Sequence, residues 1–215
     1  MKSIEILQIA AMVSALATAI IGHEIMHGLT AYKYGDPTAK MQGRLSINPI
    51  VHVDIVGTII VPALLYFSNA PFLFGWAKPV PVNMGVVINN GGYNGAIAVS
   101  LAGIVYNFFV AVVSALIISF LPPAHSLGEA FLEMFLYFSV IYNVVLGFFN
   151  LVPIPPLDGA NALMYLSLKM RLYAVADFIK KIFPYGMIFL IVVLATPLSD
   201  FIFKPAFYLI RLLLN

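Results

Sequence analysis

Long apolar runs, separated by short polar stretches, divide the chain. The strongest runs extend from Ile4 to about Ala31, from Gly95 to Leu121 and from Ala130 to Leu151, and a last run from about Pro184 to Leu214 is interrupted near Pro197. A transmembrane helix needs ~20 apolar residues at a rise of about 1.5 Å each. Each run is therefore long enough to cross a bilayer, and the pattern predicts four membrane-spanning helices.

The region between the first two runs is less regular. Val53 to Leu73 is apolar, but Pro62 and Pro71 favour a re-entrant hairpin over a straight crossing. Gly75 to Asn94 is rich in Gly, Pro and Asn, which predicts extended backbone at the membrane surface or along a cavity. Met41 to Ile47 predicts a short strand or two. We therefore expect an all-α polytopic membrane protein with about 4–6 transmembrane helices and a small membrane-associated β-strand or re-entrant region after the first helix.

Composition supports the bilayer as the solvent of this chain. Hydrophobic residues make up 62% of the 215 residues and charged residues only 9%, against about 25% charged in an average soluble domain. No fixed repeat or low-complexity linker divides the sequence, so we expect one membrane domain over residues 1–215, with a core at about 4–168 and a C-terminal helix at 184–214. An alternative for the first run is a cleaved signal peptide, because Ala15-Leu16-Ala17 has the small residues of a cleavage site.

The few charges indicate how the chain is oriented. The formal net charge is only +2, so no basic surface of the kind that binds nucleic acid is expected. Basic residues instead gather after the first run and before the last one, at Lys33, Lys40, Arg44, Lys169, Arg171, Lys180 and Lys181. The loop at Pro122 to Gly128 has none. The positive-inside rule then places both basic segments in the cytoplasm and this loop outside.

The motif His23-Glu24-Ile25-Met26-His27 lies near the predicted cytoplasmic end of the first apolar run. One helical turn separates the two histidines, so both imidazoles can reach one metal ion from the same face. Glu24 lies ~100° round the helix, off that face but close enough to act as a general base on a water at the metal. An ionisable residue inside a bilayer costs roughly 2.5–3.5 kcal/mol on insertion scales. Three of them together favour a metal site or a wet cavity over isolated polar residues in a buried helix.

Two histidines leave such a site incomplete, because a catalytic zinc ion typically has three protein ligands. The chain has no cysteine, so the third ligand has to be His, Asp or Glu. The candidates are His52, His125, Asp36, Asp54, Glu129, Glu133, Asp158, Asp177 and Asp200. Asp158 differs from the others because it follows a proline-rich break, Pro153 to Pro156, at the predicted depth of the histidines. Its carboxylate either faces the metal or caps a short helix predicted over Asn161 to Leu168, and both interpretations stay open.

Taken together, these motifs resemble the site-2 protease family of intramembrane zinc metalloproteases. That family combines H-E-x-x-H in a first core transmembrane helix with Asn-x-x-Pro-x-Pro-x-Leu-Asp-Gly far downstream, which here is Asn150 to Gly159. Other stretches similar to its small bacterial members are Gly35 to Lys40, Gly43 to Pro49, Gly75 to Asn83, and Ala102-Gly103 with Asn107. The resemblance is to the small members of the family, which have no inserted PDZ domain and no regulatory domain. One departure is Ile104-Val105, where many relatives have a proline after the Ala-Gly pair.

The resemblance implies one Zn²⁺ per chain, held by His23, His27 and Asp158, with Glu24 as the catalytic glutamate. It also implies that Asn150 helps to hold the substrate backbone or the oxyanion. The implied activity is regulated intramembrane proteolysis, in which peptide bonds of a transmembrane or membrane-proximal segment are hydrolysed. The implied place is the lipid bilayer of a bacterial inner membrane, with the active site towards the cytoplasmic side. The oligomeric state stays open, a homo-oligomer included.

Two alternatives from other functional classes also stay open. A membrane metal-ion carrier could use the two histidines and a carboxylate for passage, and a catalytically silent scaffold could bind helices. Glu24 discriminates between them, because a hydrolase should lose its function in Glu24→Gln whereas a carrier need not. His52 and Asp54 also fit the family pattern, and for both we expect a supporting role rather than ligation.

Overall fold

The computed structural model describes residues 2–68 and 75–215, and these residues form helices without any strand. The elements in chain order are α1 (Lys2–Lys33), α2 (Thr38–Met41), η1 (Pro49–His52), η2 (Ile55–Ile60), α3 (Val61–Phe67), α4 (Met84–Phe120), α5 (Leu127–Leu151), α6 (Asp158–Lys169), α7 (Tyr173–Ile182), η3 (Phe183–Tyr185), α8 (Gly186–Leu194) and α9 (Leu198–Leu214). The short helix expected after Asp158 is thus confirmed as α6. The break expected near Pro197 is confirmed between α8 and α9.

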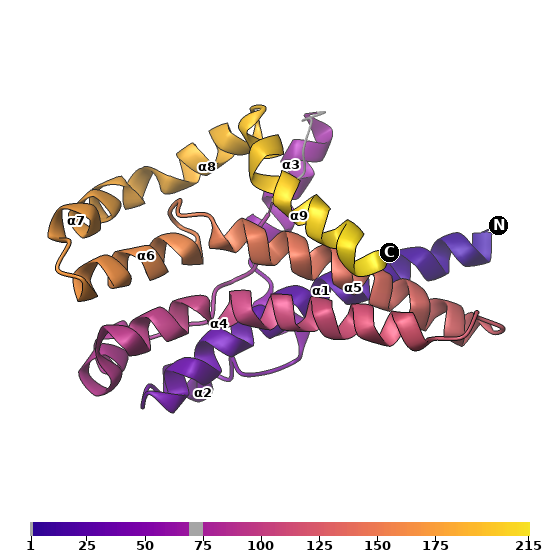
Figure 1. The fold of residues 1–215 in the computed structure, drawn as a ribbon, viewed down its shortest axis with the longest axis horizontal. Helices are drawn as coiled ribbons and strands as arrows, with labels where there is room; N and C mark the ends of the chain where they lie inside the picture. The colour runs from indigo at the N-terminus through magenta and orange to yellow at the C-terminus, as the bar shows by residue number, and fades with distance from the viewer. Residues whose placement is uncertain (1, 69–74) are drawn as a thin grey trace.

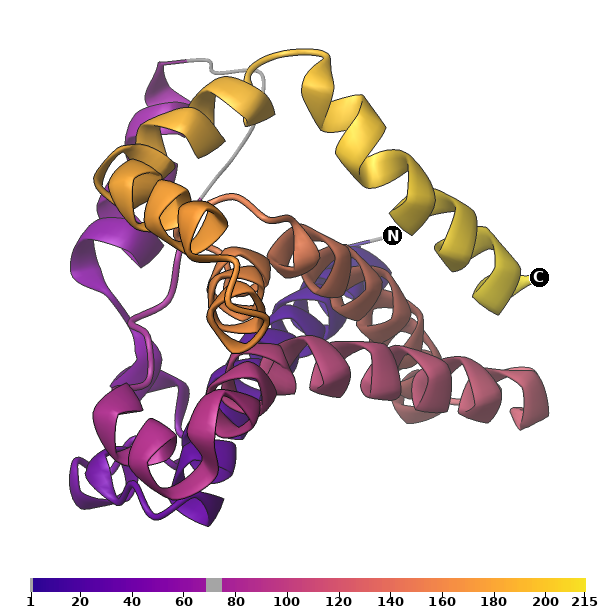
Figure 2. The ribbon, with the colours of Figure 1, turned by 60° about the vertical axis from the view of Figure 1, so that its left-hand side comes forward.

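Helices α1, α4 and α5 pack together as the centre of the molecule (Figures 1 and 2). Each is long and apolar enough to cross a membrane, and the pair made of residues 173–194 and α9, bent by 77°, adds a fourth span if it is counted as one. The described residues therefore give three or four spans. About 4–6 were predicted, so the prediction holds only if the bent pair is counted as one span. Around this centre, α6 packs on α4 and α5, and α9 packs on α5.

The buried face of α1 is a stripe of small residues that leads into the histidines. Ala11, Ala15 and Ala19 are 0% exposed and recur every four residues, and the same spacing continues to His23 and His27. Without a hydrophobic drive between helices in lipid, small residues let helix backbones approach closely and gain dispersion contacts. The packing of α1 therefore points both imidazoles into the centre of the three-helix core.

The outer faces of the long helices remain apolar where no other helix covers them. Ile9 and Val13 on α1 are 60% and 62% exposed, and Val105 and Phe109 on α4 are 63% and 65% exposed. Exposed apolar stripes of this length on adjacent helices are incompatible with water and suit hydrocarbon. The chain is therefore an integral membrane protein, as the composition predicts.

The predicted strand over Met41 to Ile47 is wrong. Met41 is the last residue of the helical turn α2, and Gly43 turns the chain with φ +65°. In the described part of the chain, the residues that follow pair with no strand. The extended segment that passes beside them, Gly75 to Asn83, contains Pro79 and Pro81. Proline has no N–H group to donate to a ladder, so single hydrogen bonds form there in place of a sheet.

The predicted extended stretch from Gly75 to Asn94 is correct only as far as Asn83. Helix α4 begins at Met84 because the Asn83 side chain caps it, accepting hydrogen bonds from the N–H groups of Gly85 and Val86 at 3.1 and 3.3 Å. The Gly- and Asn-rich residues that follow are helical, with a kink at Gly92, where φ is +59°. A good cap and tertiary packing outweigh the low helix propensity of these residues.

The described part of the apolar segment from Val53 to Leu73, residues 53–68, forms two short elements, η2 and α3. Its apolar helical part, Ile55–Leu65, is shorter than a membrane span. The end of the predicted re-entrant hairpin, residues 69–73, lies outside the described residues.

Candidate metal centre

Three side chains from two distant parts of the chain meet at one point. The Nε2 atom of His23 lies 3.0 Å from Oδ2 of Asp158 and 3.0 Å from Nε2 of His27, and the His27 nitrogen lies 3.2 Å from the same carboxylate oxygen. The side chains of His23, His27 and Asp158 are 8%, 12% and 20% exposed, respectively. Helix α1 supplies both histidines, and the first residue of α6 supplies the aspartate.

A buried amide network orients His23. Its Nδ1 lies 2.6 Å from Oδ1 of Asn107 on α4, whose Nδ2 donates to the Ala19 carbonyl at 3.2 Å and to Oδ1 of Asn143 on α5 at 2.8 Å. Asn143 Nδ2 donates in turn to the Ser139 carbonyl at 2.8 Å. Because the amide oxygen of Asn107 can only accept, Nδ1 of His23 carries a proton, and in the neutral imidazole the lone pair of Nε2 faces Asp158.

A main-chain carbonyl orients His27 in the same way. Nδ1 of His27 lies 2.7 Å from the Val99 carbonyl oxygen on α4, so Nδ1 donates its proton there and Nε2 is again a free lone pair. Close approach of α4 to α1 depends on Gly103, because a Cβ at this position would lie 2.5 Å from the His23 ring. The Ala102-Gly103 pair is therefore a packing requirement of the histidine site.

The proline-rich break before α6 delivers Asp158. Helix α5 ends at Leu151, and the chain turns through Pro153 to Pro156 before α6 begins. The N-cap position of α6 is taken by Leu157, and no side chain caps this helix. Gly159 lets the turn close on α5, because a Cβ there would lie 2.2 Å from the Leu151 carbonyl oxygen. Asp158 consequently points its carboxylate at the histidines instead of capping α6.

The donor set of these three residues fits a zinc ion. Both imidazoles direct lone pairs, and Asp158 directs a carboxylate oxygen, towards one another, an arrangement that a cation stabilises. Ligands at ~2.0–2.1 Å from a tetrahedral zinc ion lie ~3.3–3.4 Å apart, close to the 3.0–3.2 Å observed. In both histidines the other ring nitrogen, Nδ1, makes a hydrogen bond to a protein oxygen. Such a second hydrogen bond is typical of metal-ligating imidazoles.

Glu24 lies beside this cluster and has a partner that the sequence did not indicate. Its Oε2 accepts a hydrogen bond from the main-chain N–H of Val80 at 2.7 Å. Oε1 accepts no hydrogen bond from the described residues, 2–68 and 75–215. The carboxylate is thus anchored by one oxygen, and the other is available to take a proton.

The other candidate ligands do not join this cluster, and most of them make contacts elsewhere. Of the His and acidic residues that the structure describes, those that could share an ion are His23, His27 and Asp158. Asp54 caps η2 by accepting from the Gly57 N–H at 2.7 Å, and Nε2 of His52 lies 2.8 Å from the Ser46 carbonyl oxygen. Glu129 belongs to the capping box of α5, and its carboxylate accepts from the His125 N–H at 2.6 Å. Asp177 lies 4.0 Å from Lys180 on α7.

Asn150 lies in the last turn of α5, eight residues before Asp158. Its Nδ2 donates to the Leu146 carbonyl at 3.1 Å, one turn back in the same helix. No hydrogen bond joins Asn150 to His23, Glu24, His27 or Asp158 in the described structure. Its suggested role in holding a substrate therefore stays a prediction.

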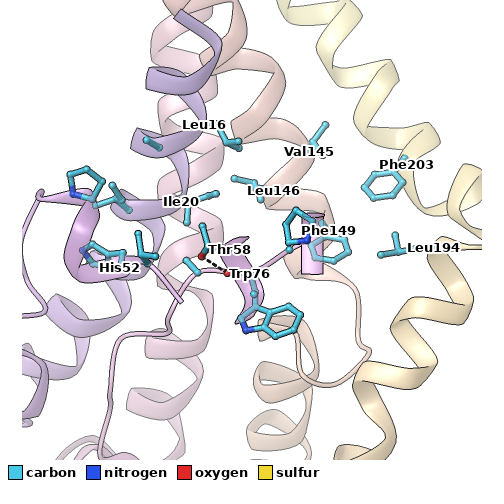
Figure 3. A pocket seen from close by; sticks show the side chains of 18 of the residues that line it. Leu16, Ile20, His52, Thr58, Trp76, Val145, Leu146, Phe149, Leu194 and Phe203 are labelled. Carbon is cyan, nitrogen blue, oxygen red and sulfur yellow. Dashed lines mark hydrogen bonds between the residues drawn. The ribbon is translucent and has the colours of Figure 1, made fainter. Parts of the chain in front are cut away.

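A cavity of about 730 Å³ lies between α1, α5 and α9, and His23, Glu24, His27 and Asp158 are not among its lining residues. Figure 3 shows Leu16 and Ile20 of α1, Val145, Leu146 and Phe149 of α5, and Phe203 of α9 around it, with Trp76 below. Ile20 is one turn before His23 and Glu24 on α1. Apart from His52, Thr58 and Ser199, the lining residues are apolar, aromatic, proline or glycine, so the space suits apolar groups.

Known proteins with similar sequences identify the family of this chain. A family model described as "Peptidase family M50" matches residues 124–194, which include Asn150 and Asp158. "Putative zinc metalloprotease YwhC" of Bacillus subtilis (strain 168) is 34% identical over 204 residues, covering 90% of this chain and 84% of the relative. "Putative zinc metalloprotease Rip2" of Mycolicibacterium smegmatis (strain ATCC 700084 / mc(2)155) is 31% identical over 145 residues, covering 66% of this chain and 51% of the relative. No solved structure matches the chain.

Proposed function

The chain belongs to peptidase family M50, the site-2 protease family of zinc metalloproteases, and we propose that it hydrolyses peptide bonds of transmembrane or membrane-proximal segments. In this proposal His23, His27 and Asp158 hold one zinc ion, and Glu24 is the general base. The observation that carries it is the convergence of three ligand atoms within 4.8 Å of one another, next to a glutamate anchored by a single oxygen.

The side chains divide the chemistry between them. When bound, zinc lowers the pKa of water towards ~7 and polarises a peptide carbonyl. Glu24 takes the proton of the attacking water on Oε1 and delivers it to the nitrogen of the leaving amine. Asn107 and the Val99 carbonyl keep the two imidazoles in the tautomer that leaves Nε2 free. Asn150 uses one Nδ2 hydrogen on its own helix, and the second is available for a substrate carbonyl.

The substrate enters, in this proposal, through the apolar cavity lined by Ile20, which lies one helical turn before Glu24 on α1. Its volume of about 730 Å³ lies within the ~300–1,000 Å³ of ordinary ligand sites, which is room for a few side chains of an extended segment. Helical peptide bonds are shielded by their own hydrogen bonds, so the segment has to unwind before its carbonyl is accessible. We therefore expect a preference for transmembrane segments with residues that weaken a helix near the cleaved bond.

The active site faces the cytoplasmic side in this proposal. The end of α1 that follows the histidines leads into α2, and the opposite end of the bundle holds the α4–α5 turn (Figure 1). Lys33 and Lys40 lie at the first of these ends, whereas residues 122–128 at the second contain no Lys or Arg. The positive-inside rule orients the bundle accordingly.

The test is cleavage of a model substrate by purified protein in liposomes. A suitable probe is a tagged single-span peptide with a Leu/Ala-rich core interrupted by Asn-Gly, and zinc content is measured on the same samples. We expect cleavage by wild type and a loss of about 10²–10⁴-fold in Glu24→Gln, with one zinc per chain kept, because removing a general base costs about this much. His23→Ala and Asp158→Ala should lose both zinc and cleavage.

Three outcomes would count against this function. Full zinc binding in Asp158→Ala would move the third ligand elsewhere. Retained cleavage in Glu24→Gln would remove the base from the mechanism. Zinc flux into the liposomes, equal in wild type and Glu24→Gln and without cleavage, would make the protein a metal carrier.

A further inference from the structure

The residues that hold Glu24 belong to an extended segment, Gly75 to Asn83, which we call the strap. It runs from the cavity, where Trp76 lies, to the start of α4. Val80 is 7% exposed and lies against α1 at Gly28, where a Cβ would be 2.8 Å from its side chain. Val80 stands between Pro79 and Pro81, so its N–H is the single main-chain donor of this tripeptide. That donor is the one that binds Glu24.

Buried polar groups fix the strap on both sides of Val80. The Lys78 N–H donates to the His52 carbonyl at 2.9 Å, and the Lys78 carbonyl accepts from Nη2 of Arg44 at 2.6 Å. The Asn83 N–H donates to Oδ2 of Asp36 at 2.6 Å. The hydrogen bonds at Lys78 and Asn83 therefore fix the position of the Val80 N–H between them.

The carboxylate of Asp36 is itself held in place. It is 1% exposed, and its Oδ1 accepts from the N–H and the hydroxyl of Thr38. Burial raises the pKa of Asp36, but the hydrogen bonds from Thr38 and Asn83 outweigh it and hold the pKa below its usual value. Asp36 therefore stays ionised, as an acceptor for the strap.

Arg44 is the least expected of these groups. It is 6% exposed, it has no ion pair with a carboxylate within residues 2–68 and 75–215, and its buried Nε has no hydrogen-bond partner in that same part. A buried guanidinium without a carboxylate is costly to stability. Arg44 donates to the main-chain carbonyl of Lys78, two residues before Val80, whose N–H binds Glu24.

We propose that Arg44 is a positioning residue for Glu24, acting through the strap. Its guanidinium fixes the Lys78 carbonyl, the strap then presents the Val80 N–H to Oε2 of Glu24, and Oε1 is left facing the reaction. The inference rests on the proposed function in that it assigns Glu24 the proton transfer. Misplacing a reacting group by about 1 Å can cost on the order of 100-fold in rate. Arg44 can therefore have a large effect on kcat although it does not belong to the proposed metal site.

The kinetic test compares Arg44→Met with Arg44→Lys, and Val80→Pro with Val82→Pro. Val80→Pro removes the N–H that binds Glu24, whereas the Val82 N–H has no hydrogen bond in the described structure and makes a matched control. With the tagged single-span peptide, we expect kcat to fall about 10–100-fold in Arg44→Met and Val80→Pro. KM and zinc content should stay within about twofold of wild type. Arg44→Lys, which keeps a charged donor, should recover much of the loss, and Val82→Pro should resemble wild type.

A second measurement does not depend on peptidase activity. Hydrogen–deuterium exchange of the peptide spanning Ala77 to Asn83 should be about tenfold faster in Arg44→Met and in Glu24→Ala than in wild type, because each change frees the strap. If wild type cleaves nothing but exchange responds in this way, the proposed function fails and the contact between Arg44, the strap and Glu24 stands. Unchanged exchange in Arg44→Met would overturn the inference. So would wild-type kcat in this variant, zinc loss together with kcat, or equal losses in Val80→Pro and Val82→Pro.

Discussion

Replacing Asn107 by leucine separates the orientation of His23, a proposed zinc ligand, from the packing around it. The side chain of Asn107 is 0% exposed and its Oδ1 lies 2.6 Å from Nδ1 of His23. Leucine has nearly the same shape, so Asn107→Leu fills the space but removes both the acceptor for His23 and the donor for Asn143. His23 then loses the hydrogen bond that selects its tautomer, and Nε2 is no longer fixed as the free lone pair.

The magnitude follows from the groups left behind. Loss of such a supporting hydrogen bond costs about 10–100-fold in metal affinity, which equals about 1.4–2.8 kcal/mol. The substitution also leaves two buried groups without partners, Nδ1–H of His23 and Oδ1 of Asn143, at a cost to folding of about 1–3 kcal/mol each. The Ala19 carbonyl still has its helical partner and adds little.

The assay is zinc affinity by competition with a chromophoric chelator, together with thermal unfolding of the zinc-free protein. The double variant Asn107→Leu with Asn143→Leu should recover about half of the lost stability, because it removes the orphaned acceptor of Asn143 but leaves Nδ1–H of His23 without a partner, and it should not recover the zinc affinity. Ser114→Ala, buried on the same face of α4 two turns further on, is the control and should bind zinc normally. Wild-type zinc affinity in folded Asn107→Leu would refute the idea that Asn107 orients a ligand.

Three further changes test other parts of the structure. Gly103→Ala should abolish zinc binding, because its Cβ would lie 2.5 Å from the His23 ring, whereas Gly128→Ala, whose Cβ has Ser126 Oγ at 4.0 Å as its nearest neighbour, should leave the zinc content at one per chain. The lowered pKa of Asp36 means that its stabilisation is present above the unfolded value of ~3.9 and is lost as the pH falls through the folded value. Thermal midpoints measured against pH should therefore fall more steeply below about pH 4 in wild type than in Asp36→Asn. Ser126→Ala breaks the capping box of α5 and should lower the thermal midpoint, at a cost of about 0.5–2 kcal/mol, without changing zinc affinity.

Features that depend on local spacing could be predicted from the sequence. His23 and His27 share a face because they are four residues apart in a helix, and the proline break before Asp158 is visible in the chain itself. The choice of Asp158 among nine candidate ligands needed either the family resemblance or the fold. Locally it could as well have been a cap, since the same side chain accepts main-chain N–H groups at many helix starts.

Features that depend on long-range contacts could not be predicted. Asn143 is one polar residue in an apolar helix, and nothing in its neighbours indicates that it supports Asn107 thirty-six residues away. The hydrogen bond from Val80 to Glu24 uses a main-chain N–H, for which side-chain patterns carry no signal. The start of α4 does have a local signal, Asn83 as its N-cap, but the Gly- and Asn-rich residues after it favour extended chain, and only the packing of α4 in the fold overrides that preference.

The polar interior also explains why the site tolerates a bilayer. Each donor around the histidines is used: the two Nδ1–H groups on Asn107 and Val99, and the amide of Asn107 on Asn143 and Ala19. Only acceptors then remain at the centre, where two imidazole lone pairs and a carboxylate oxygen lie 3.0–3.2 Å apart. A cation is the partner that satisfies all of them at once, so binding it should stabilise the folded state by RT ln(1 + [L]/Kd), about 2.7 kcal/mol at a hundred times Kd. The amide network that selects the imidazole tautomers therefore links zinc affinity to the packing of α1, α4 and α5. A substitution at Asn143 should change the zinc affinity, although Asn143 contacts Asn107 and not the three proposed ligands.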